Sequence, residues 1–365
     1  MLSLVIPTRN RPHFLRRLLQ YYHDVGCSHQ IVIADSSDAE NLVLNQRVVD
    51  SFQTVLTIDH RVYKYDIEIR EKLNDSLKHV HTPYTAVGAD DDFLIPSSLG
   101  RAMEFLQEHS DYSIAHGDAV LFVLEENGAY GRIRDTSRYA QRSIENNTGA
   151  HRMLNHLTRY SPTWNSVQRT EFSREHYRKT VELETDLTFI ELLPSTLSLI
   201  RGKTKKLDML YMVRQAHGQQ TSTNDREHQT IFDWIASPMW SGQYQNFQEC
   251  LSLAIAQQDN ISADQARSIV KRAFWSFTAI HLKSKWASTY RDESPGVHQG
   301  LRQIAARIPG LRTARRQLRS FLSGEENEAT LPALLRPGSK HHSDFLPIYR
   351  AITEIPLNNG ATSQN

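Results

Sequence analysis

The first 125 residues alternate short apolar runs with amphipathic helical patterns, and this alternation restricts the fold more than any other feature of the chain. The apolar runs lie at 2–6, 30–34, 54–58, 84–89 and 112–115. Helical periodicity lies between them, over 12–25, 41–52, 69–81 and 99–109. Strands that alternate with helices form a mostly parallel sheet with helices on its faces. The sequence therefore predicts an α/β fold.

Composition and charge exclude several classes of protein. The 42 basic and 41 acidic residues leave a net charge of +1, which disfavours a nucleic-acid partner. The two cysteines, Cys27 and Cys250, are far apart and lack zinc-like spacing, so a disulfide framework is excluded and a reducing compartment is expected. The chain has no run of about 18 apolar residues, and its first apolar run ends at Pro7 without the features of a signal peptide. We expect a cytoplasmic protein.

Beyond residue 135 helical periodicity dominates, over 140–160, 183–200 and 227–323. After Gly324 the sequence is polar and is interrupted by prolines. We therefore expect three parts, namely an α/β domain over 1–222, a helical extension over 223–323, and a polar, partly disordered tail over 324–365.

Three polar clusters directly follow predicted strands: Thr8-Arg9-Asn10, Asp35-Ser36-Ser37-Asp38 and Asp90-Asp91-Asp92. Ligands of open parallel sheets bind outside the carboxyl ends of the strands. Neither a G-x-G-x-x-G turn after the first strand nor a Walker-type phosphate loop occurs in the chain. The clusters predict a ligand site at this edge of the sheet, but not a dinucleotide site.

The three consecutive aspartates repel one another unless a positive group lies among them. Mg²⁺ or Mn²⁺ relieves this repulsion, because each takes carboxylate oxygens and bridges to substrate phosphates. A solvated acidic turn that caps the next helix is the alternative. The position at a strand end favours a metal site.

The segments VIPTRNRP, IVIADSSD and YTAVGADDDFLIP, in this order, resemble the nucleotide-binding half of an inverting GT-A-fold glycosyltransferase of family 2. The resemblance covers residues 2–125 well and 160–217 weakly. It implies a sugar transfer from a nucleoside-diphosphate donor, with UDP as the expected nucleotide, to the hydroxyl of a glycan or glycolipid acceptor. It also implies Mn²⁺ or Mg²⁺ as cofactor and a role in polysaccharide or glycoconjugate synthesis.

The resemblance assigns the donor-nucleotide contacts residue by residue. Candidates match the turn facing the nucleoside, the aspartate that binds the base, the basic position near the diphosphate, and the acidic motif: Pro7, Thr8, Arg9, Asp35, Lys72, Asp90 and Asp91. An exposed helical lysine is the alternative for Lys72.

The acidic motif departs from the family pattern, which is Asp-x-Asp-Asp followed by a proline four residues after the last aspartate. Pro96 fixes the register, so Ala89 occupies the first acidic position. Asp90 and Asp92 still form an Asp-x-Asp pair, which we assign to the metal together with His217. Which two of the three aspartates bind the metal stays open.

Inverting transfer needs a carboxylate to take the proton of the acceptor hydroxyl. The stretch LETDLTFIELL resembles the family segment that supplies it, with Asp186 as first candidate, Glu191 as second and Glu184 behind them. Stabilisation of a helix start is the alternative for Asp186. Trp164 is a candidate to stack on the acceptor sugar, and a place in the core is its alternative.

The segment 299–323 contains six arginines and no acidic residue. It predicts either a peripheral contact with the anionic inner face of a membrane or a packed helix pair with a solvated arginine face. Two other functions stay open. A nucleotidyltransferase needs a glycine-rich phosphate loop, which TRNRPHF lacks, and Ala89 is compatible with a catalytically degenerate GT-A scaffold.

Overall fold

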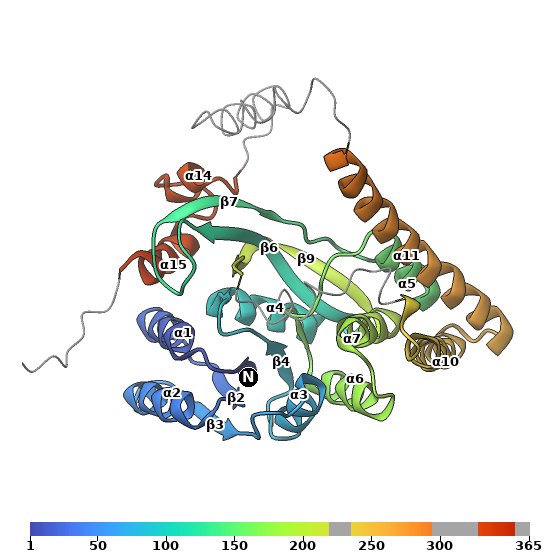
Figure 1. Cartoon of the computed structure of the whole chain (residues 1–365), viewed down its shortest axis with the longest axis horizontal. Helices are drawn as coiled ribbons and strands as arrows, with labels where there is room; N and C mark the ends of the chain where they lie inside the picture. The colour runs from blue at the N-terminus through green and yellow to red at the C-terminus, as the bar shows by residue number, and fades with distance from the viewer. Residues whose placement is uncertain (219–234, 294–327, 355–365) are drawn as a thin grey trace, which may run out of the picture.

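A nine-stranded sheet flanked by helices forms the centre of the protein in the computed structural model (Figure 1). The structure describes residues 1–218, 235–293 and 328–354. The strand order is β3-β2-β1-β4-β8-β6-β9-β5, and β7 pairs with β6 beside this path.

The strands are β1 (Leu2–Thr8), β2 (Gln30–Asp35), β3 (Ile58–Val62), β4 (Tyr84–Val87), β5 (Phe93–Leu94), β6 (Tyr112–Leu124), β7 (Ile133–Tyr139), β8 (Val167–Arg169) and β9 (Lys203–Gln215). The helices are α1 (Pro12–Asp24), α2 (Ala39–Phe52), α3 (Ile69–Lys78), α4 (Pro96–Glu108), α5 (Gly149–Thr158), α6 (Thr170–Glu182), α7 (Leu187–Arg201), α10 (Trp240–Asp259), α11 (Ala263–Glu293), α14 (Leu331–Leu335) and α15 (His342–Thr353).

Most strands run in one direction. The pairs β1–β2, β1–β4 and β2–β3 are parallel. Because β8 is antiparallel to both β4 and β6, β6 has the direction of β4, and β9 is parallel to β6. Only β5, β7 and β8 among the described strands run the other way. The predicted α/β fold with a mostly parallel sheet is confirmed.

The central strand β1 is buried on both faces. Its Leu4 and Ile6 belong to the main core cluster, whereas Val5 packs with Leu73 and Leu77 of α3 in a second cluster. A parallel strand that is covered on both sides needs apolar residues at successive positions. This explains why LSLVIP is nearly continuous in its apolar character.

The third strand lies later than predicted. Residues 54–58 were expected to form it, but β3 covers Ile58–Val62 and reads IDHRV. This strand is at the edge of the sheet, its first four residues are half-buried and Val62 is exposed, so polar residues are tolerated there. Its sequence therefore lacks the apolar run that marks a buried strand.

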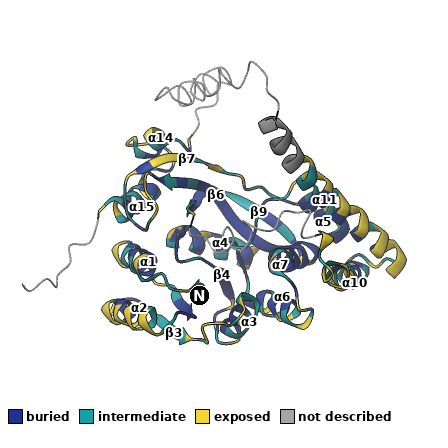
Figure 2. Ribbon diagram, in the orientation of Figure 1, coloured by how far each residue is buried: buried dark blue, intermediate teal, exposed yellow. Residues whose placement is uncertain are grey.

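The helical extension shares a core with the α/β domain. Phe189 of α7 packs in one apolar cluster with Phe247 of α10 and Phe274 of α11, and Met153 of α5 belongs to the same cluster. Figure 2 shows that these helices bury the sides that face one another. A boundary at residue 222 thus divides one hydrophobic core. Within the described ranges no helix is both long and apolar enough to span a membrane.

The C-terminal helices correct the expectation of a polar tail for residues 328–354. Phe345, Ile348 and Ile352 of α15 are fully buried in the main core cluster, and α15 packs against α1. Ala329 accepts a hydrogen bond from Thr136 of β7 (2.7 Å), and Ile352 accepts one from the Gly131 amide (3.0 Å). The helical spacing of these apolar residues was the signal, and Pro347 within the helix obscured it. Residues 355–365 lie outside the described ranges.

We expect Phe345→Ala to lower the free energy of unfolding by about 3–5 kcal/mol, because it leaves a cavity in the main core. Urea unfolding followed by circular dichroism measures the change. Leu253→Ala, at an exposed position of α10, is the control and should have little effect. Equal effects of the two substitutions would contradict the packing of α15 on the core.

Candidate functional site

The carboxyl ends of β1, β2, β4 and β9 bring the main sequence candidates together. We call Thr8, Asp35, Lys72, Asp90, Asp91, Asp92 and His217 the strand-end cluster. The Thr8 hydroxyl donates a hydrogen bond to Asp90 Oδ2 (2.7 Å). Lys72, from α3, donates to the Thr8 carbonyl (3.1 Å) and to Ser36 Oγ (2.7 Å). These bonds join the ends of the three parallel strands.

The aspartate triplet is buried, and basic side chains surround it. The exposed fractions of Asp90, Asp91 and Asp92 are only 2–4%. Arg11 lies 3.0 Å from Asp90 Oδ1 and 3.1 Å from Asp91 Oδ2. The triplet is therefore no solvated turn, and the chain itself supplies positive charge for these carboxylates.

His217 and Arg214, at the end of β9, complete the charge balance. His217 Nε2 lies 2.9 Å from Asp91 Oδ2, and Arg214 Nε lies 3.6 Å from Asp92 Oδ2. Asp92 Oδ1 also accepts a hydrogen bond from the Gln215 amide (3.0 Å). Asp91 and Asp92 thus point to different partners on the same strand end.

Negative charge is concentrated on Asp91. Burial, together with the charge of Asp91, raises the pKa of Asp90 to about 6 and that of Asp92 to about 8. Burial also acts to raise the pKa of Asp91, but the hydrogen bond with His217 and the charge of Arg11 outweigh it and leave the pKa below its usual value. Asp91 is therefore the member of the triplet that stays ionised most readily.

This arrangement favours a different metal-binding pair from the one predicted. The predicted ligands Asp90 and Asp92 are engaged by separate partners, whereas Asp91 and His217 are in direct contact. Among the described residues, no group of three or more His, Cys, Asp or Glu side chains is arranged to hold a metal ion. Mg²⁺ and Mn²⁺ sites often combine one or two protein ligands with substrate phosphates. The carboxylate and imidazole of Asp91 and His217 fit such a substrate-completed site.

Lys72 is buried and is not the exposed helical lysine of the alternative reading. Burial lowers its pKa to about 8, although the charges of Asp35 and Asp90 act in the opposite direction. Its ammonium group is fixed between the ends of β1 and β2. This places a cation where the strand ends meet.

Asp35 is fully buried, and its carboxylate has partners within the protein. Oδ1 accepts from the Ser37 amide (2.9 Å), while Oδ2 lies 2.8 Å from Asn45 Nδ2 and 3.2 Å from His60 Nε2. Burial acts to raise the pKa of Asp35, but the hydrogen bonds with His60, Ser37 and Asn45 outweigh it and lower the pKa. Sequence reasoning missed Asn45 and His60, since neither belongs to a motif.

The loops that follow β1 and β2 are joined by hydrogen bonds. Asn10 adopts a left-handed backbone conformation (φ 56°), which asparagine tolerates better than most residues. Its amide donates to Ser37 Oγ (2.8 Å), and its side-chain oxygen accepts from the Asp38 amide (2.9 Å). The Arg9 guanidinium lies 4.2 Å from the ring centre of Tyr65. Pro7 is the penultimate residue of β1.

The two candidate bases lie on α7 and have different surroundings. Asp186 is the N-cap, and its Oδ1 accepts from the amides of Thr188 and Phe189 (both 2.9 Å). Glu191 accepts a hydrogen bond from the Tyr160 hydroxyl. Glu191 is also one of the acidic groups, after Asp92, that raise the pKa of Arg214 against the effect of burial. Glu191 thus interacts electrostatically with Arg214, whose guanidinium lies beside Asp92.

Glu184 and Trp164 are less closely connected to the cluster. Glu184 has a positive φ of 47°, is exposed, and uses its carbonyl to accept from Gln243 (3.1 Å). The half-buried Trp164 ring packs edge-on against Tyr177, with ring centres 5.7 Å apart, beside the second core cluster. Part of this tryptophan thus has the core role of the alternative reading. Its contact with an acceptor stays a prediction.

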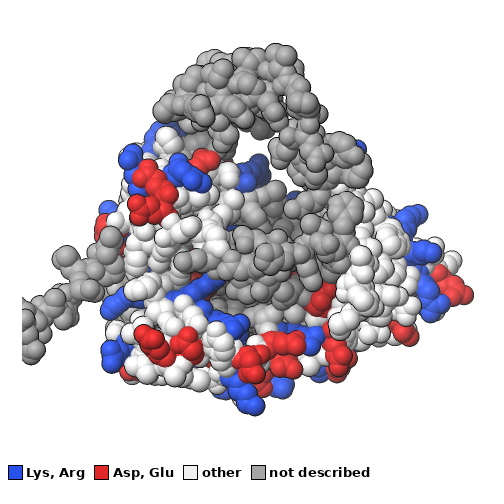
Figure 3. Space-filling model, in the orientation of Figure 1, with Lys and Arg blue, Asp and Glu red and all other residues white. Residues whose placement is uncertain are grey.

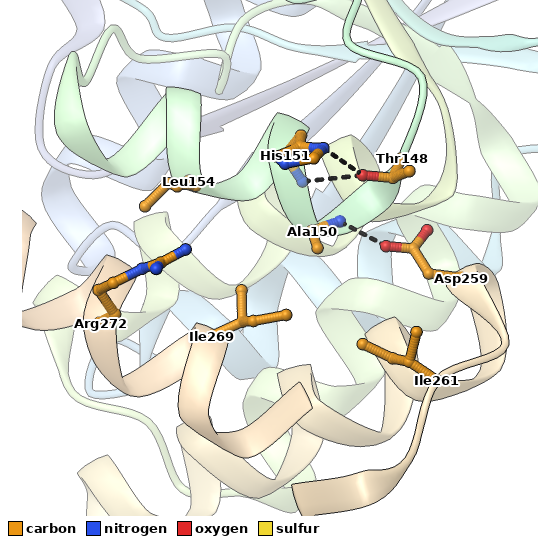
Figure 4. Close-up of a pocket in the computed structure, with 8 residues that line it drawn as sticks. All are labelled: Thr148, Ala150, His151, Leu154, Asp259, Ile261, Ile269 and Arg272. Carbon is orange, nitrogen blue, oxygen red and sulfur yellow. Dashed lines mark hydrogen bonds between the residues drawn. The ribbon is translucent and has the colours of Figure 1, made fainter. Parts of the chain in front are cut away.

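The surface charge on one face of the protein and a pocket away from the strand-end cluster both differ from this site. On the face in Figure 3, acidic and basic side chains are interspersed among the described residues. A pocket of about 240 Å³ lies between α5 and α11, with Leu154, Ile261, Ile269 and Arg272 in its lining (Figure 4). Asp259, also in the lining, accepts from the Gly149 and Ala150 amides and so caps α5. None of the strand-end cluster lines this pocket.

Comparisons with known proteins return structural neighbours only. No protein-family profile and no curated protein matches the sequence. TarS of S. aureus (residues 1–349) aligns with 80% of this chain and 92% of its own, at 15% identity and a TM-score of 0.41. Its complex with UDP-GlcNAc aligns with 78% and 92%, at 14% identity and a TM-score of 0.42.

A mannosyltransferase, PcManGT from Pyrobaculum calidifontis in complex with GDP-Man and Mn²⁺, is a further neighbour. It aligns with 86% of this chain and 82% of its own, at 10% identity and a TM-score of 0.41. These values are too low to support a conclusion about activity. Our functional assignment rests on the residues of the strand-end cluster.

The raised pKa of Asp92 makes stability depend on pH. Between about pH 4 and pH 8 the folded protein keeps a proton that the unfolded chain loses, so this group lowers the free energy of unfolding as pH rises. Asp92→Asn retains the acceptor for the Gln215 amide but removes the titration. Relative to wild type, we expect the variant to gain more than about 1 kcal/mol of stability between pH 5 and pH 8.

Urea unfolding at both pH values in metal-free buffer measures this difference. Asp66→Asn, on the exposed loop before α3, is the matched control and should change little. A stability difference between Asp92→Asn and wild type that is the same at pH 5 and pH 8 would show that Asp92 is ionised normally.

Proposed function

We propose that this protein is a metal-dependent, inverting glycosyltransferase of the GT-A type, which moves a sugar from a nucleoside-diphosphate donor to an acceptor hydroxyl. The observation that carries the proposal is the contact between Asp91 and His217 at 2.9 Å, at the carboxyl ends of β4 and β9. Arg11 contacts Asp91 itself, and Lys72 and Asp35 lie at the adjoining ends of β1 and β2. The two cations suit a diphosphate, and the Asp91 carboxylate and His217 imidazole suit a divalent ion that would bind to it.

The residues of the cluster have distinct roles in this proposal. Asp91 and His217 hold a divalent ion, which when bound supplies positive charge for the leaving diphosphate. Lys72 adds a fixed cation at the same strand ends, and Arg11, which contacts Asp90 and Asp91, adds a second one. Asp35 and the β1 turn at Pro7, Thr8 and Arg9 receive the nucleoside, with uracil as the expected base.

The acceptor side of the site lies toward α7 and the loop that contains Trp164. A carboxylate there takes the proton of the acceptor hydroxyl as it attacks the anomeric carbon and the nucleoside diphosphate leaves. Asp186 and Glu191 are the two candidates. The contact of Glu191 with Tyr160 and its influence on Arg214 support Glu191, whereas the family resemblance supports Asp186.

The metal assignment is tested by measuring UDP affinity by calorimetry, once in the presence of Mn²⁺ and once in EDTA. We expect Mn²⁺ to strengthen UDP binding to the wild type, and Asp91→Asn to remove this gain, with a loss of about 10–100-fold. Asp92→Asn is the matched control, since the same change at the neighbouring carboxylate spares the contact with His217. The opposite pattern would support the Asp90–Asp92 pair predicted from the sequence.

The general base is identified by a pair of isosteric variants. Asparagine is as good an N-cap as aspartate, so Asp186→Asn keeps the start of α7 and removes only the base. Glu191→Gln likewise keeps an acceptor for Tyr160. We expect one of the two to lower kcat by about 10²–10⁴-fold with little change in donor affinity. Unchanged turnover in both would place the base outside α7 and its N-cap.

The donor itself is identified by thermal shift. Nucleoside diphosphates and sugar nucleotides are compared at equal concentration, each with and without Mn²⁺, and the ligand that binds the folded state most tightly raises the melting temperature most. A nucleoside triphosphate as the best ligand would favour the nucleotidyltransferase alternative. Binding of a sugar nucleotide without metal-dependent turnover would favour the degenerate scaffold.

Several sequence predictions remain predictions. Residues 299–323, to which the membrane contact is assigned, lie outside the described ranges, as does all of the expected extension beyond α11. A role in polysaccharide or glycoconjugate synthesis and a location at the inner face of the membrane also stay predictions.

A further inference from the structure

Arg17 is a buried cation beneath the proposed metal-binding pair. Its side chain comes from α1 and is 1% exposed. Nη2 donates to the backbone carbonyl of Asp91 (2.9 Å), and Nη1 donates to Gln215 Oε1 (2.6 Å) and to the carbonyl of Ala129. One guanidinium thus binds the chain at Asp91 and, on the other strand end, two residues before His217.

Gln215 extends this connection on both sides. Its amide donates to Asp92 Oδ1 (3.0 Å), and its Nε2 donates to the Gly128 carbonyl (2.8 Å). Gly128 and Ala129 belong to the turn between β6 and β7. Arg17 and Gln215 therefore fix three segments relative to one another, namely the aspartate triplet, the end of β9 and the β6–β7 turn.

Phe14, one helical turn before Arg17, contacts the other member of the pair. Its ring stacks on the His217 imidazole, with ring centres 5.0 Å apart and planes 18° apart. The Arg17 guanidinium lies 5.1 Å from the same Phe14 ring and 4.8 Å from the Phe93 ring. One face of α1 thus supports Asp91 through its backbone and His217 through its ring.

A fully buried arginine adds little net stability to a folded protein. Desolvation of a guanidinium costs several kcal/mol, and well-packed apolar residues often replace buried ion pairs without loss. Arg17 is surrounded by the aromatic rings of Phe14 and Phe93, so an apolar side chain would also pack there. Its retained charge and three acceptor contacts indicate a role in fixing the site.

We propose that Arg17 and Phe14 are positioning residues that hold Asp91 and His217 at metal-binding distance. This inference rests on the proposed function, because it concerns the metal-binding pair of that site. Arg17 restrains the backbone on both strand ends, and Phe14 fixes the plane of the imidazole. Neither side chain needs to touch the donor.

The test measures UDP affinity in Mn²⁺ and in EDTA for four variants, together with their melting temperatures. We expect Arg17→Met to lose about tenfold or more of the Mn²⁺-dependent affinity while its metal-free UDP affinity stays within a few-fold of wild type. Arg17→Lys keeps the charge and should recover part of the loss. Phe14→Leu should give a smaller loss of the Mn²⁺-dependent UDP affinity. Arg16→Met, at the neighbouring arginine of α1, is the control and should change UDP affinity neither in Mn²⁺ nor in EDTA.

The outcomes separate this inference from the proposed function. If the wild type shows no Mn²⁺-dependent gain in UDP affinity, the proposed metal site is wrong. If the wild type shows the gain and both Arg17→Met and Phe14→Leu retain it, the positioning role is wrong. If Arg17→Met fails to fold, Phe14→Leu decides. A loss of UDP affinity in Mn²⁺ alone supports the positioning role, and an equal loss in Mn²⁺ and in EDTA contradicts it.

Discussion

The burial of three consecutive carboxylates is the constraint on which the rest of the structure depends. Carboxylates at 2–4% exposure are unfavourable unless cations and hydrogen-bond donors compensate them. Here the compensation comes from both ends of the α/β domain in sequence. Arg11 directly precedes α1, and Arg17 lies within it. Arg214 and Gln215 are the last two residues of β9, and His217 follows them. The aspartate triplet therefore joins the first and last parts of the sheet.

This arrangement links the candidate site to packing far from it. Arg17 is buried on the side of α1 that packs toward the sheet, and α15 packs against both α1 and β9. The acceptor side is supported in a comparable way. The candidate bases are the N-cap and an inner residue of α7, and α7 shares its core with α10 and α11. The extension and the C-terminal helices thus support two different sides of one site.

Sequence reasoning predicted those parts of the molecule in which local pattern and burial agree. The apolar runs of β1, β2 and β4 and the polar clusters after them were sufficient to predict the sheet and the edge where the candidates meet. It failed for the edge strand β3, where IDHRV carries no burial signal, and for α15, where Pro347 lies inside an apolar helical pattern. It could not choose among the three aspartates either. That choice depends on the partners Arg11, Arg214 and His217, which are brought there by tertiary contacts.

The late position of α15 in the chain has a consequence for biogenesis. Ribosomal synthesis proceeds at about 5–20 residues per second, so the apolar surface of α1 that Phe345, Ile348 and Ile352 finally cover stays open for tens of seconds after α1 has emerged. A nascent chain with that surface open is a substrate for holdase chaperones and is prone to aggregate. Folding of the first half is therefore completed only once α15 has been synthesised and docks. A chain truncated before residue 345 should leave this apolar surface uncovered and should aggregate more readily than the full chain.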